Sequence, residues 1–301
     1  MGTPEYAVPF FEGLVQNGFA PITVVSQPDR PVGRKQIIES TPVKKAAQEL
    51  GVPVIQPENA NDATFLNKLR ELNPDVFVVV AFGQILSAAL LEIPRLGTIN
   101  VHPSLLPKYR GAAPLQEAIL SGDSETGVTI MLMDEKMDHG PILLQEKIAL
   151  APDETLSTLQ DKTIAVGVPL LLKAIELLEA GTAQKTSQDD SKATYTRLLT
   201  RDSGKLDFSK SAQELERHVR ALNPWPGTWM EWKGKRLKIV NAVASVRDGE
   251  NKKPGEFFAG PDELFVQCAS GALQILKLQR EGKSLMTARE FINGHQKDLA
   301  H

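Results

Sequence analysis

The sequence predicts an α/β protein with a doubly wound parallel sheet, followed by a smaller β domain. Up to residue 180, short apolar segments alternate with segments whose apolar residues recur at helical spacing, which is typical of a parallel sheet covered by helices. From residue 229 to residue 278, short alternating segments are separated by turns, which is typical of a small barrel. We therefore expect a Rossmann-like sheet and then an OB-like barrel of the oligonucleotide-binding type.

The length of 301 residues suits two domains, each long enough to bury a core. Residues 181–204 are rich in Thr, Ser, Gln and Asp, and they predict a linker that passes over the surface. We therefore expect a first domain over residues 1–180 and a C-terminal domain over residues 205–301.

In the first domain, a turn at residues 2–4 leads into an amphipathic helix that ends near residue 16. The expected strands are residues 22–25, 52–55, 76–81, 127–133 and 142–148. The expected helices are residues 43–50, 63–72, 115–120 and 156–178. Residues 27–41, between the first strand and the next helix, predict a loop.

In the second domain, an amphipathic helix is expected over residues 212–222, and its apolar spacing makes His218 a structural residue. Short strands are expected at residues 229–232, 236–240, 255–258, 264–268 and 273–277. We expect the three tryptophans, Trp225, Trp229 and Trp232, in the core.

Charge is distributed unevenly, although the formal net charge is only −3. Residues 1–204 carry 18 basic and 25 acidic side chains, a sum of −7, whereas residues 205–301 carry 16 and 12, a sum of +4. The basic C-terminal part indicates an anionic partner.

Cys268 is the single cysteine, so no disulfide can form within the chain, and its apolar neighbours predict a buried and inert thiol. No apolar run approaches the roughly 18 residues that span a bilayer, and the chain does not begin with a basic segment followed by an apolar one. We expect a cytoplasmic protein with no membrane partner.

The most informative stretch runs from residue 97 to residue 114. Ile99 and Val101 alternate with Asn100 and His102, so an amide and an imidazole share one face of a strand. The strand must stop at Pro103, because proline has no N–H for the ladder. In open parallel sheets, ligands bind at the carboxyl ends of strands.

This polar pair suits acyl transfer. An amide N–H and a histidine can hold a negative oxygen in the transition state, and the histidine can also move a proton. Asp138, which precedes Gly140-Pro141 in a turn, offers a carboxylate that would complete the set. Each of these residues, taken alone, is more often a turn or core residue than a catalyst.

Several motifs together closely resemble those of the folate-dependent formyltransferase family, over essentially the whole chain. They are Asn100-Val101-His102-Pro103-Ser104-Leu105-Leu106-Pro107, Arg110-Gly111-Ala112-Ala113-Pro114 and Asp138-His139-Gly140. The Ala-Ala-Pro ending, Gln27-Pro28-Asp29-Arg30-Pro31-Val32-Gly33-Arg34 and Asn223-Pro224-Trp225-Pro226 are most similar to members that act on a methionylated initiator tRNA.

The resemblance implies a catalytic set of Asn100, His102 and Asp138. It also implies 10-formyltetrahydrofolate as formyl donor, with no metal. The residues that would shape the folate site are Ser104, Leu105, Leu106, Pro107, Phe82, Gly83, Ile85, Leu86 and Met133.

For the acceptor, the resemblance implies a methionyl initiator tRNA whose acceptor end meets the loop that carries Arg34 and Lys35. Four cations of the second domain would follow phosphates, because that domain is basic, and they are Lys233, Lys235, Arg236 and Lys238. We expect a monomer.

In this family a short apolar strand precedes the Gly2-Thr3-Pro4 turn, and that first strand is absent here. We therefore expect Met1 to be an internal residue of the natural product.

Three alternatives differ in class. A nucleotide-dependent oxidoreductase lacks support, because the early turn has no G-x-G-x-x-G pattern. Formyltransferases that act on amino sugars or on a purine precursor share the catalytic set and change only the acceptor. A pure RNA-binding protein would leave the polar pair at the strand end unexplained.

Overall fold

The computed structural model describes residues 1–33, 36–260 and 262–299. The chain divides into two compact units. The first comprises Met1–Pro114, Glu125–Ala149 and Gln160–Thr196, and the second comprises Leu115–Ser124, Leu150–Leu159 and Arg197–His301. Each unit is described by itself.

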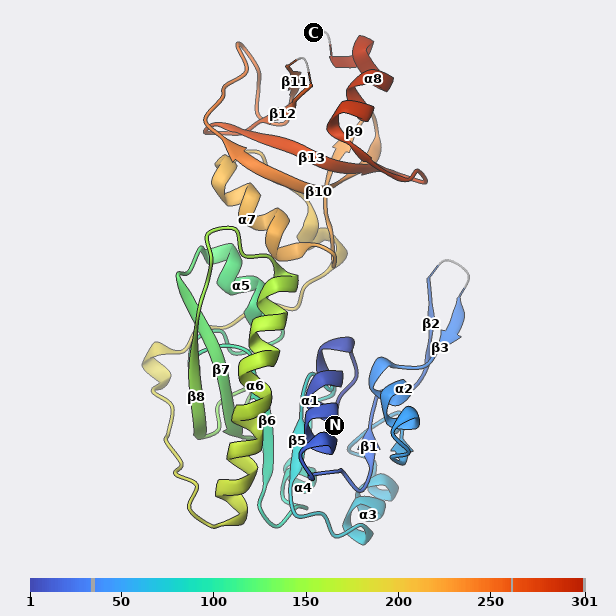
Figure 1. Cartoon of the computed structure of the whole chain (residues 1–301), viewed down its shortest axis with the longest axis vertical. Coiled ribbons are helices and arrows are strands. Elements are labelled where there is room, and N and C mark those ends of the chain that lie inside the picture. Colours follow the sequence, from blue (N-terminus) through green and yellow to red (C-terminus); the bar gives the residue numbers. More distant parts are fainter. Residues whose placement is uncertain (34–35, 261, 300–301) are drawn as a thin grey trace. The chain divides into compact units, whose positions relative to one another are not determined.

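The first unit is organised on parallel and antiparallel strand pairs (Figure 1). β1 (Val24–Val25) pairs in parallel with β4 (Val54–Ile55). A second sheet has the order β5-β6-β7-β8, from β5 (Phe77–Val79), β6 (Thr98–His102), β7 (Glu125–Leu132) and β8 (Ile142–Ala149).

Only part of the second sheet is parallel. β5 and β6 run in the same direction, as expected, whereas β7 is antiparallel to both β6 and β8. The connection over residues 133–141 is too short for the crossover that a parallel pair needs, so β7 and β8 form a hairpin around Asp138. The expectation of a purely parallel sheet is therefore wrong at this edge.

The backbone of Met1 and Gly2 runs between β1 and β5. Gly2 N–H donates to the Val25 carbonyl at 3.0 Å, and Val80 N–H donates to the Met1 carbonyl at 2.9 Å. The Met1 nitrogen donates to the Val78 carbonyl at 2.6 Å.

Helices cover these strands, and two of them begin at side-chain caps. Thr41 caps α2 by accepting from Lys44 N–H, and Asp62 caps α3 by accepting from Thr64 N–H. The helices and the single-turn 3-10 helix, in chain order up to residue 179, are η1 (Glu5–Ala7), α1 (Val8–Gln16), α2 (Pro42–Glu49), α3 (Ala63–Glu71), α4 (Ala88–Leu91), α5 (Pro114–Ser121) and α6 (Leu156–Glu179).

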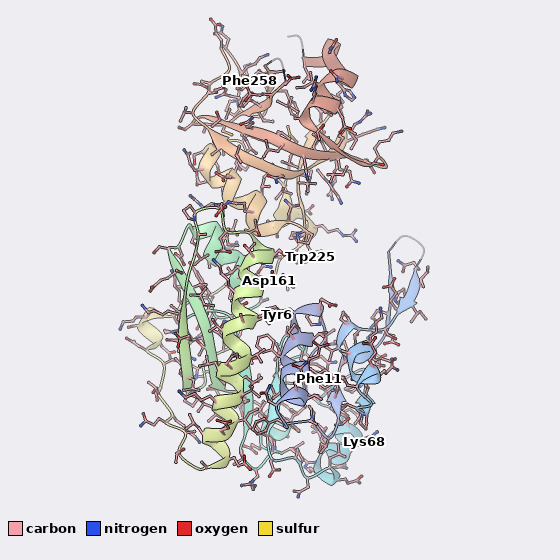
Figure 2. The ribbon with its side chains drawn as sticks, viewed as in Figure 1. Tyr6, Phe11, Lys68, Asp161, Trp225 and Phe258 are labelled. Atoms are coloured by element: carbon pink, nitrogen blue, oxygen red, sulfur yellow. The ribbon has the colours of Figure 1, made fainter. Side chains whose placement is uncertain are left out.

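Tyr6, labelled in Figure 2, donates its hydroxyl to Thr163 of α6 at 3.2 Å. Burial raises the pKa of this phenol to about 12. A cavity of about 410 Å³ lies in the same unit, lined mainly by apolar residues of β1, β5 and α1. Asn100, His102 and Asp138 do not line this cavity.

A small hairpin replaces the loop expected over residues 27–41. β2 (Arg30–Val32) and β3 (Ile37–Glu39) pair antiparallel and project from the rest of the first unit (Figure 1). Ile37 and Ile38 are 56% and 69% exposed. Arg34 and Lys35 lie outside the described residues.

The second unit is an antiparallel sheet with a helix before it and a helix after it. The strand order is β11-β12-β13-β10-β9, with β14 also paired to β13. The elements are α7 (Ala212–Leu222), β9 (Thr228–Trp232), β10 (Lys235–Ser245), β11 (Phe257–Ala259), β12 (Leu264–Gln267), β13 (Ala272–Arg280), β14 (Leu285–Thr287) and α8 (Ala288–Leu299). A closed barrel is not confirmed, because β9 and β11 end the sheet without pairing to each other among the described residues.

The core of the second unit joins α7 and α8 to the sheet through residues such as Leu215, Val219 and Phe291. Cys268 is buried there as predicted, with 2% of its surface exposed. Trp229 and Trp232 are partly buried, but the prediction for Trp225 is wrong, because its side chain is 55% exposed after the end of α7 (Figure 2).

No helix within the described ranges is both long and apolar enough to cross a bilayer.

Candidate active site

β6 presents the predicted polar pair. The strand lies between β5 and β7, with Asn100 opposite Val79 and Met131. Successive side chains of a strand point to opposite faces of the sheet. Asn100 and His102 therefore share a face. His102 is 4% exposed, whereas Asn100 is partly exposed, and its amide makes no hydrogen bond with any residue that the structure describes. That amide is available to a ligand.

His102 is held by the loop that follows it. Its Nε2 atom lies 2.9 Å from the carbonyl oxygen of Tyr109, so Nε2 carries a proton and donates it. The other ring nitrogen, Nδ1, faces the Asp138 carboxylate with a separation of 3.7 Å between Nδ1 and Oδ2. This distance is longer than a hydrogen bond and lies within ion-pair range.

The loop from Ser104 to Tyr109 is fixed by short internal bonds. Ser104 Oγ donates to the Lys108 carbonyl at 2.5 Å, and Thr129 Oγ1 of β7 donates to the Ser104 carbonyl at 2.6 Å. Tyr109 has φ of 63°, a left-handed conformation that residues with a side chain rarely adopt. The carbonyl oxygen that accepts the hydrogen bond from the imidazole therefore belongs to a residue with a constrained backbone.

Asp138 is fixed on the opposite side of the imidazole. Its Oδ2 atom accepts a 2.7 Å hydrogen bond from Gly111 N–H. Its φ of 48° is left-handed, at a cost of about 1–3 kcal/mol. Gly140 cannot be replaced in this turn, because a Cβ atom there would lie 1.9 Å from the Leu132 carbonyl oxygen.

Together these three side chains can polarise a carbonyl and move a proton. The Asn100 amide offers N–H donors, and the His102 ring can carry a second proton on the side that faces a carboxylate. Such a set can stabilise a developing negative charge on an oxygen and move a proton.

The residues predicted to line a folate site fall into two groups. Phe82 and Leu86 are buried in one apolar cluster, and Met133 packs against it. Ile85 is 83% exposed, and Gly83 adopts φ of 88° beside it. This group therefore combines a buried apolar cluster with one exposed apolar side chain, that of Ile85.

The second group is the loop itself. Ser104 and Leu106 are buried at 0% and 3% exposure, and Leu106 N–H donates to Thr129 Oγ1 at 3.2 Å. Leu105 and Pro107 are partly exposed. Ser104 and Leu106 thus fix the conformation of the loop, and the side chains of Leu105 and Pro107 are accessible to a ligand.

Of the four predicted cations of the second unit, Lys233, Lys235 and Arg236 line one hollow, and Lys238 does not. Arg236 and Lys238 alternate with the buried Leu237 and Ile239, so they point away from the core. Arg236 is already engaged, because its guanidinium lies 3.2 Å from Asp202 and 4.0 Å from the Trp229 ring centroid.

Lys233 and Lys235 line a hollow of about 490 Å³ on the second unit. Arg236, Arg280 at the end of β13 and Lys283 in the turn that follows line it as well. Trp232 and His295 contribute aromatic surface, and Glu281 contributes the one carboxylate in the lining. The hollow is therefore strongly basic.

Two residues beside these three side chains were not predicted as site residues, although Arg110 belongs to one of the motifs quoted above. Arg110 is 1% exposed although it is a charged residue in a loop. Gln188 lies in the segment expected to be a linker, and its amide donates to the carbonyl oxygens of Asp138 and Gly140, both at 2.8 Å. The polarity of that segment indicated a loop, and only the fold reveals these contacts.

The part of the chain that the structure describes contains no group of three or more His, Cys, Asp or Glu side chains that could hold a metal ion.

Comparisons with known proteins agree with this geometry. The family model described as formyl transferase matches residues 1–175, and the model described as formyl transferase, C-terminal domain, matches residues 198–296. A methionyl-tRNA formyltransferase of Lachnospira eligens is 45% identical over 98% of this chain and 96% of that protein. One from Myxococcus xanthus is 44% identical over 98% of this chain and 94% of that protein.

Solved structures show the same fold. A sugar 3N-formyl transferase, WlaRD, solved with dTDP and 5-N-formyl-THF, has a TM-score of 0.66 at 20% identity and covers 94% of this chain and 97% of its own. An N-formyltransferase from Helicobacter canadensis, solved with folinic acid and dTDP-3-aminofucose, has a TM-score of 0.67 at 22% identity, covering 93% and 97%. The chain therefore belongs to the formyl transferase family, and within it to the group of the methionyl-tRNA formyltransferases.

Proposed function

We propose that this chain transfers the formyl group of 10-formyltetrahydrofolate to the α-amino group of methionine carried by initiator tRNA. The observation that carries the proposal is the sequence identity of up to 45%, over nearly the full chain, with methionyl-tRNA formyltransferases. The polar face of β6 supports it, because Asn100 and His102 are the donors that acyl transfer to an amine requires.

In the proposed reaction, the amine nitrogen of methionine attacks the formyl carbon, whose carbonyl oxygen becomes negative. The Asn100 amide stabilises that oxygen, and the His102 ring does so through Nδ1, because Nε2 already donates to the Tyr109 carbonyl. The free Asn100 amide supports this role, since it needs no other bond to be broken first.

The reaction ends with the transfer of one proton. The bond between the formyl carbon and N10 of the folate breaks, and the proton that leaves the amine is relayed to N10. The Asp138 carboxylate faces the imidazole at 3.7 Å, so these two residues carry the relay. The products are tetrahydrofolate and N-formylmethionyl-tRNA.

We place the folate against Phe82, Gly83, Ile85, Leu86 and Met133 on one side and Ser104 to Pro107 on the other. Exposed Ile85 above a buried apolar cluster suits a flat heteroaromatic ring. Support also comes from the two solved relatives above, which were crystallised with 5-N-formyl-THF and folinic acid. The proposal includes no metal ion.

For the tRNA, we propose contacts from Arg34 and Lys35, which follow β2 in the sequence and lie outside the described residues, and from the second unit. Lys233 and Lys235 line the basic hollow, where phosphates would lie. Arg236 lines the same hollow with a guanidinium already paired with Asp202, and Lys238 adds charge outside it.

We assign residues 1–180 to catalysis and residues 205–301 to an OB-like RNA-binding domain, joined by residues 181–204. We further propose a monomer that acts in the cytoplasm, where initiator tRNA is used.

The acceptor is tested by single-turnover formyl transfer from 10-formyltetrahydrofolate to methionyl initiator tRNA, deacylated tRNA and a nucleotide-linked amino sugar in parallel. Transfer to the charged tRNA alone supports the proposal. The amino sugar is the second candidate acceptor, because the solved relatives include sugar N-formyltransferases. Transfer to the sugar without transfer to tRNA would overturn the assignment of the acceptor.

A further inference from the structure

We propose that Arg110 and Gln188 form a clamp that positions Asp138 for catalysis. Both residues contact other protein groups around Asp138, so we assign them as positioning residues that act through that side chain. The inference rests on the function proposed above, because it assumes that the Asp138 carboxylate serves the reaction.

Gln188 is the part of the clamp that touches the Asp138 turn. Its Nε2 atom donates to the carbonyl oxygens of Asp138 and Gly140, each at 2.8 Å, and so spans both ends of the turn around His139. An amide nitrogen has two N–H groups, so both are used. The turn is thereby tied to a residue about fifty positions later in the sequence.

Arg110 fixes the direction in which that amide points. Its Nε and Nη2 atoms donate to Gln188 Oε1 at 3.1 and 2.9 Å, a fork that one amide oxygen can accept. With the oxygen held in this way, the amide nitrogen must face the turn. Arg110 is 1% exposed, so water does not compete strongly for these bonds.

A second arm joins the same guanidinium to the residue after Asp138. Arg110 Nη2 donates to Asp190 Oδ1 at 2.8 Å, and Asp190 Oδ2 lies 3.2 Å from His139 Nε2. His139 Nδ1 lies 2.6 Å from Asp134 at the start of the turn. The hydrogen bond from Arg110 also lowers the pKa of Asp190, which keeps that carboxylate charged.

Arg110 is itself anchored through its backbone. Its N–H donates to the Thr194 carbonyl at 2.8 Å, and its carbonyl accepts from Thr196 N–H at 2.7 Å. The residues on either side of Arg110 also belong to the site. The Tyr109 carbonyl accepts a hydrogen bond from the His102 ring, and Gly111 N–H donates to the Asp138 carboxylate. One short loop therefore sets the positions of both His102 and Asp138.

The turn needs such support because its backbone is strained. Asp138 holds φ of 48°, a conformation that a side chain disfavours. Misplacement of a catalytic group by about 1 Å can cost about a hundredfold in rate. Loss of the clamp should therefore lower kcat and leave the binding of both substrates largely unchanged.

The test is a double-mutant cycle on the full chain. Gln188→Glu keeps an oxygen for Arg110 and loses the N–H groups that bind the turn, so it separates the two halves of the clamp. We expect kcat to fall by about tenfold to a hundredfold, with both KM values within about twofold of wild type. In an Asp138→Asn background the same change should cost less than about twofold, because the group that it positions is gone.

Arg110→Lys provides a second variant that keeps the charge and loses the fork, and it should follow the same pattern. Gln274→Leu is the matched control, since that amide donates to Glu263 at 3.1 Å in the second unit and should leave kcat unchanged. Melting temperatures confirm that each variant is folded.

The outcomes distinguish failure of the proposed role of Asp138 from failure of the proposed clamp. If Asp138→Asn alone retains wild-type kcat, the proposed role of Asp138 fails. If Asp138→Asn is slow while Gln188→Glu and Arg110→Lys retain wild-type kcat, the role of Asp138 stands and the clamp is wrong. A Gln188→Glu effect that persists in full in the Asp138→Asn background also overturns the clamp.

Discussion

The Nδ1 atom of His102 lies 3.7 Å from the Oδ2 atom of Asp138, and the same oxygen accepts a 2.7 Å hydrogen bond from Gly111 N–H. The imidazole is held at its other nitrogen by the Tyr109 carbonyl. Both partners are thus fixed by backbone groups at a separation just beyond a hydrogen bond. Catalytic hydrogen bonds are often long without substrate and shorten in the complex.

Asn100→Ala should lower kcat for formyl transfer by about 10²–10³, because it removes the N–H donor to the developing oxyanion. Folding should be intact, since the Asn100 side chain makes no hydrogen bond within the described residues. Steady-state kinetics and a melting curve measure both effects. Asn67→Ala, at an exposed position on α3, is the control and should behave as wild type. Equal kcat for both variants would exclude Asn100 from catalysis.

Lys235→Ala and Lys283→Ala should each weaken binding of methionyl-tRNA, because both side chains line the basic hollow. The logarithm of affinity should also depend less steeply on the logarithm of salt concentration, by about one unit of slope for each phosphate that the variant no longer binds. Binding measured from 50 mM to 200 mM salt, about the range over which such effects are large, tests this. Lys277→Ala, exposed and outside the hollow, should keep the full slope. An equal decrease of slope in all three variants would show only a general charge effect.

The free energy of unfolding should fall as the pH drops below 6.5, because burial lowers the pKa of His218 below that ordinary value. The unfolded chain then takes up a proton that the folded chain resists, so acid favours unfolding. The ring also donates to the Ser203 carbonyl at 2.9 Å, as a structural residue would. Urea unfolding of wild type and His218→Gln at several pH values measures the effect. The variant should lose part of the pH dependence, and identical curves would contradict the assignment.

Cys268 should react slowly with thiol reagents in the folded protein. Burial raises its pKa from 9.0 to about 11, which reduces the thiolate fraction at neutral pH by about a hundredfold. Because the chain has one cysteine, the observed rate belongs to this thiol alone. Reaction at the same rate in buffer and in concentrated urea would show that the thiol is exposed.

Sequence patterns predicted the elements that depend on local signals. α7 was predicted with its observed bounds, because its apolar residues keep helical spacing. The structure adds a capping box at its start, formed by Ser211 and Glu214. Asn100 and His102 were predicted to share a face, because residues two positions apart in a strand point to the same side of the sheet.

Other features escaped prediction because their causes are not local. The β2–β3 hairpin has exposed apolar residues, Ile37 and Ile38, so no buried face marks its strands. β14 and α8 were missed beyond residue 278. The contact of Arg110 with Gln188 joins residues 78 positions apart through side-chain hydrogen bonds, which leave no periodic trace in the sequence.

We infer that His102, together with Asn100 and Asp138, carries the chemistry of formyl transfer to methionyl-tRNA. The most direct test is the single-turnover rate of His102→Ala with saturating 10-formyltetrahydrofolate and methionyl initiator tRNA. We predict a rate about 10²–10⁴ below wild type, with binding of both substrates retained. Transfer by His102→Ala at the wild-type rate would contradict that claim.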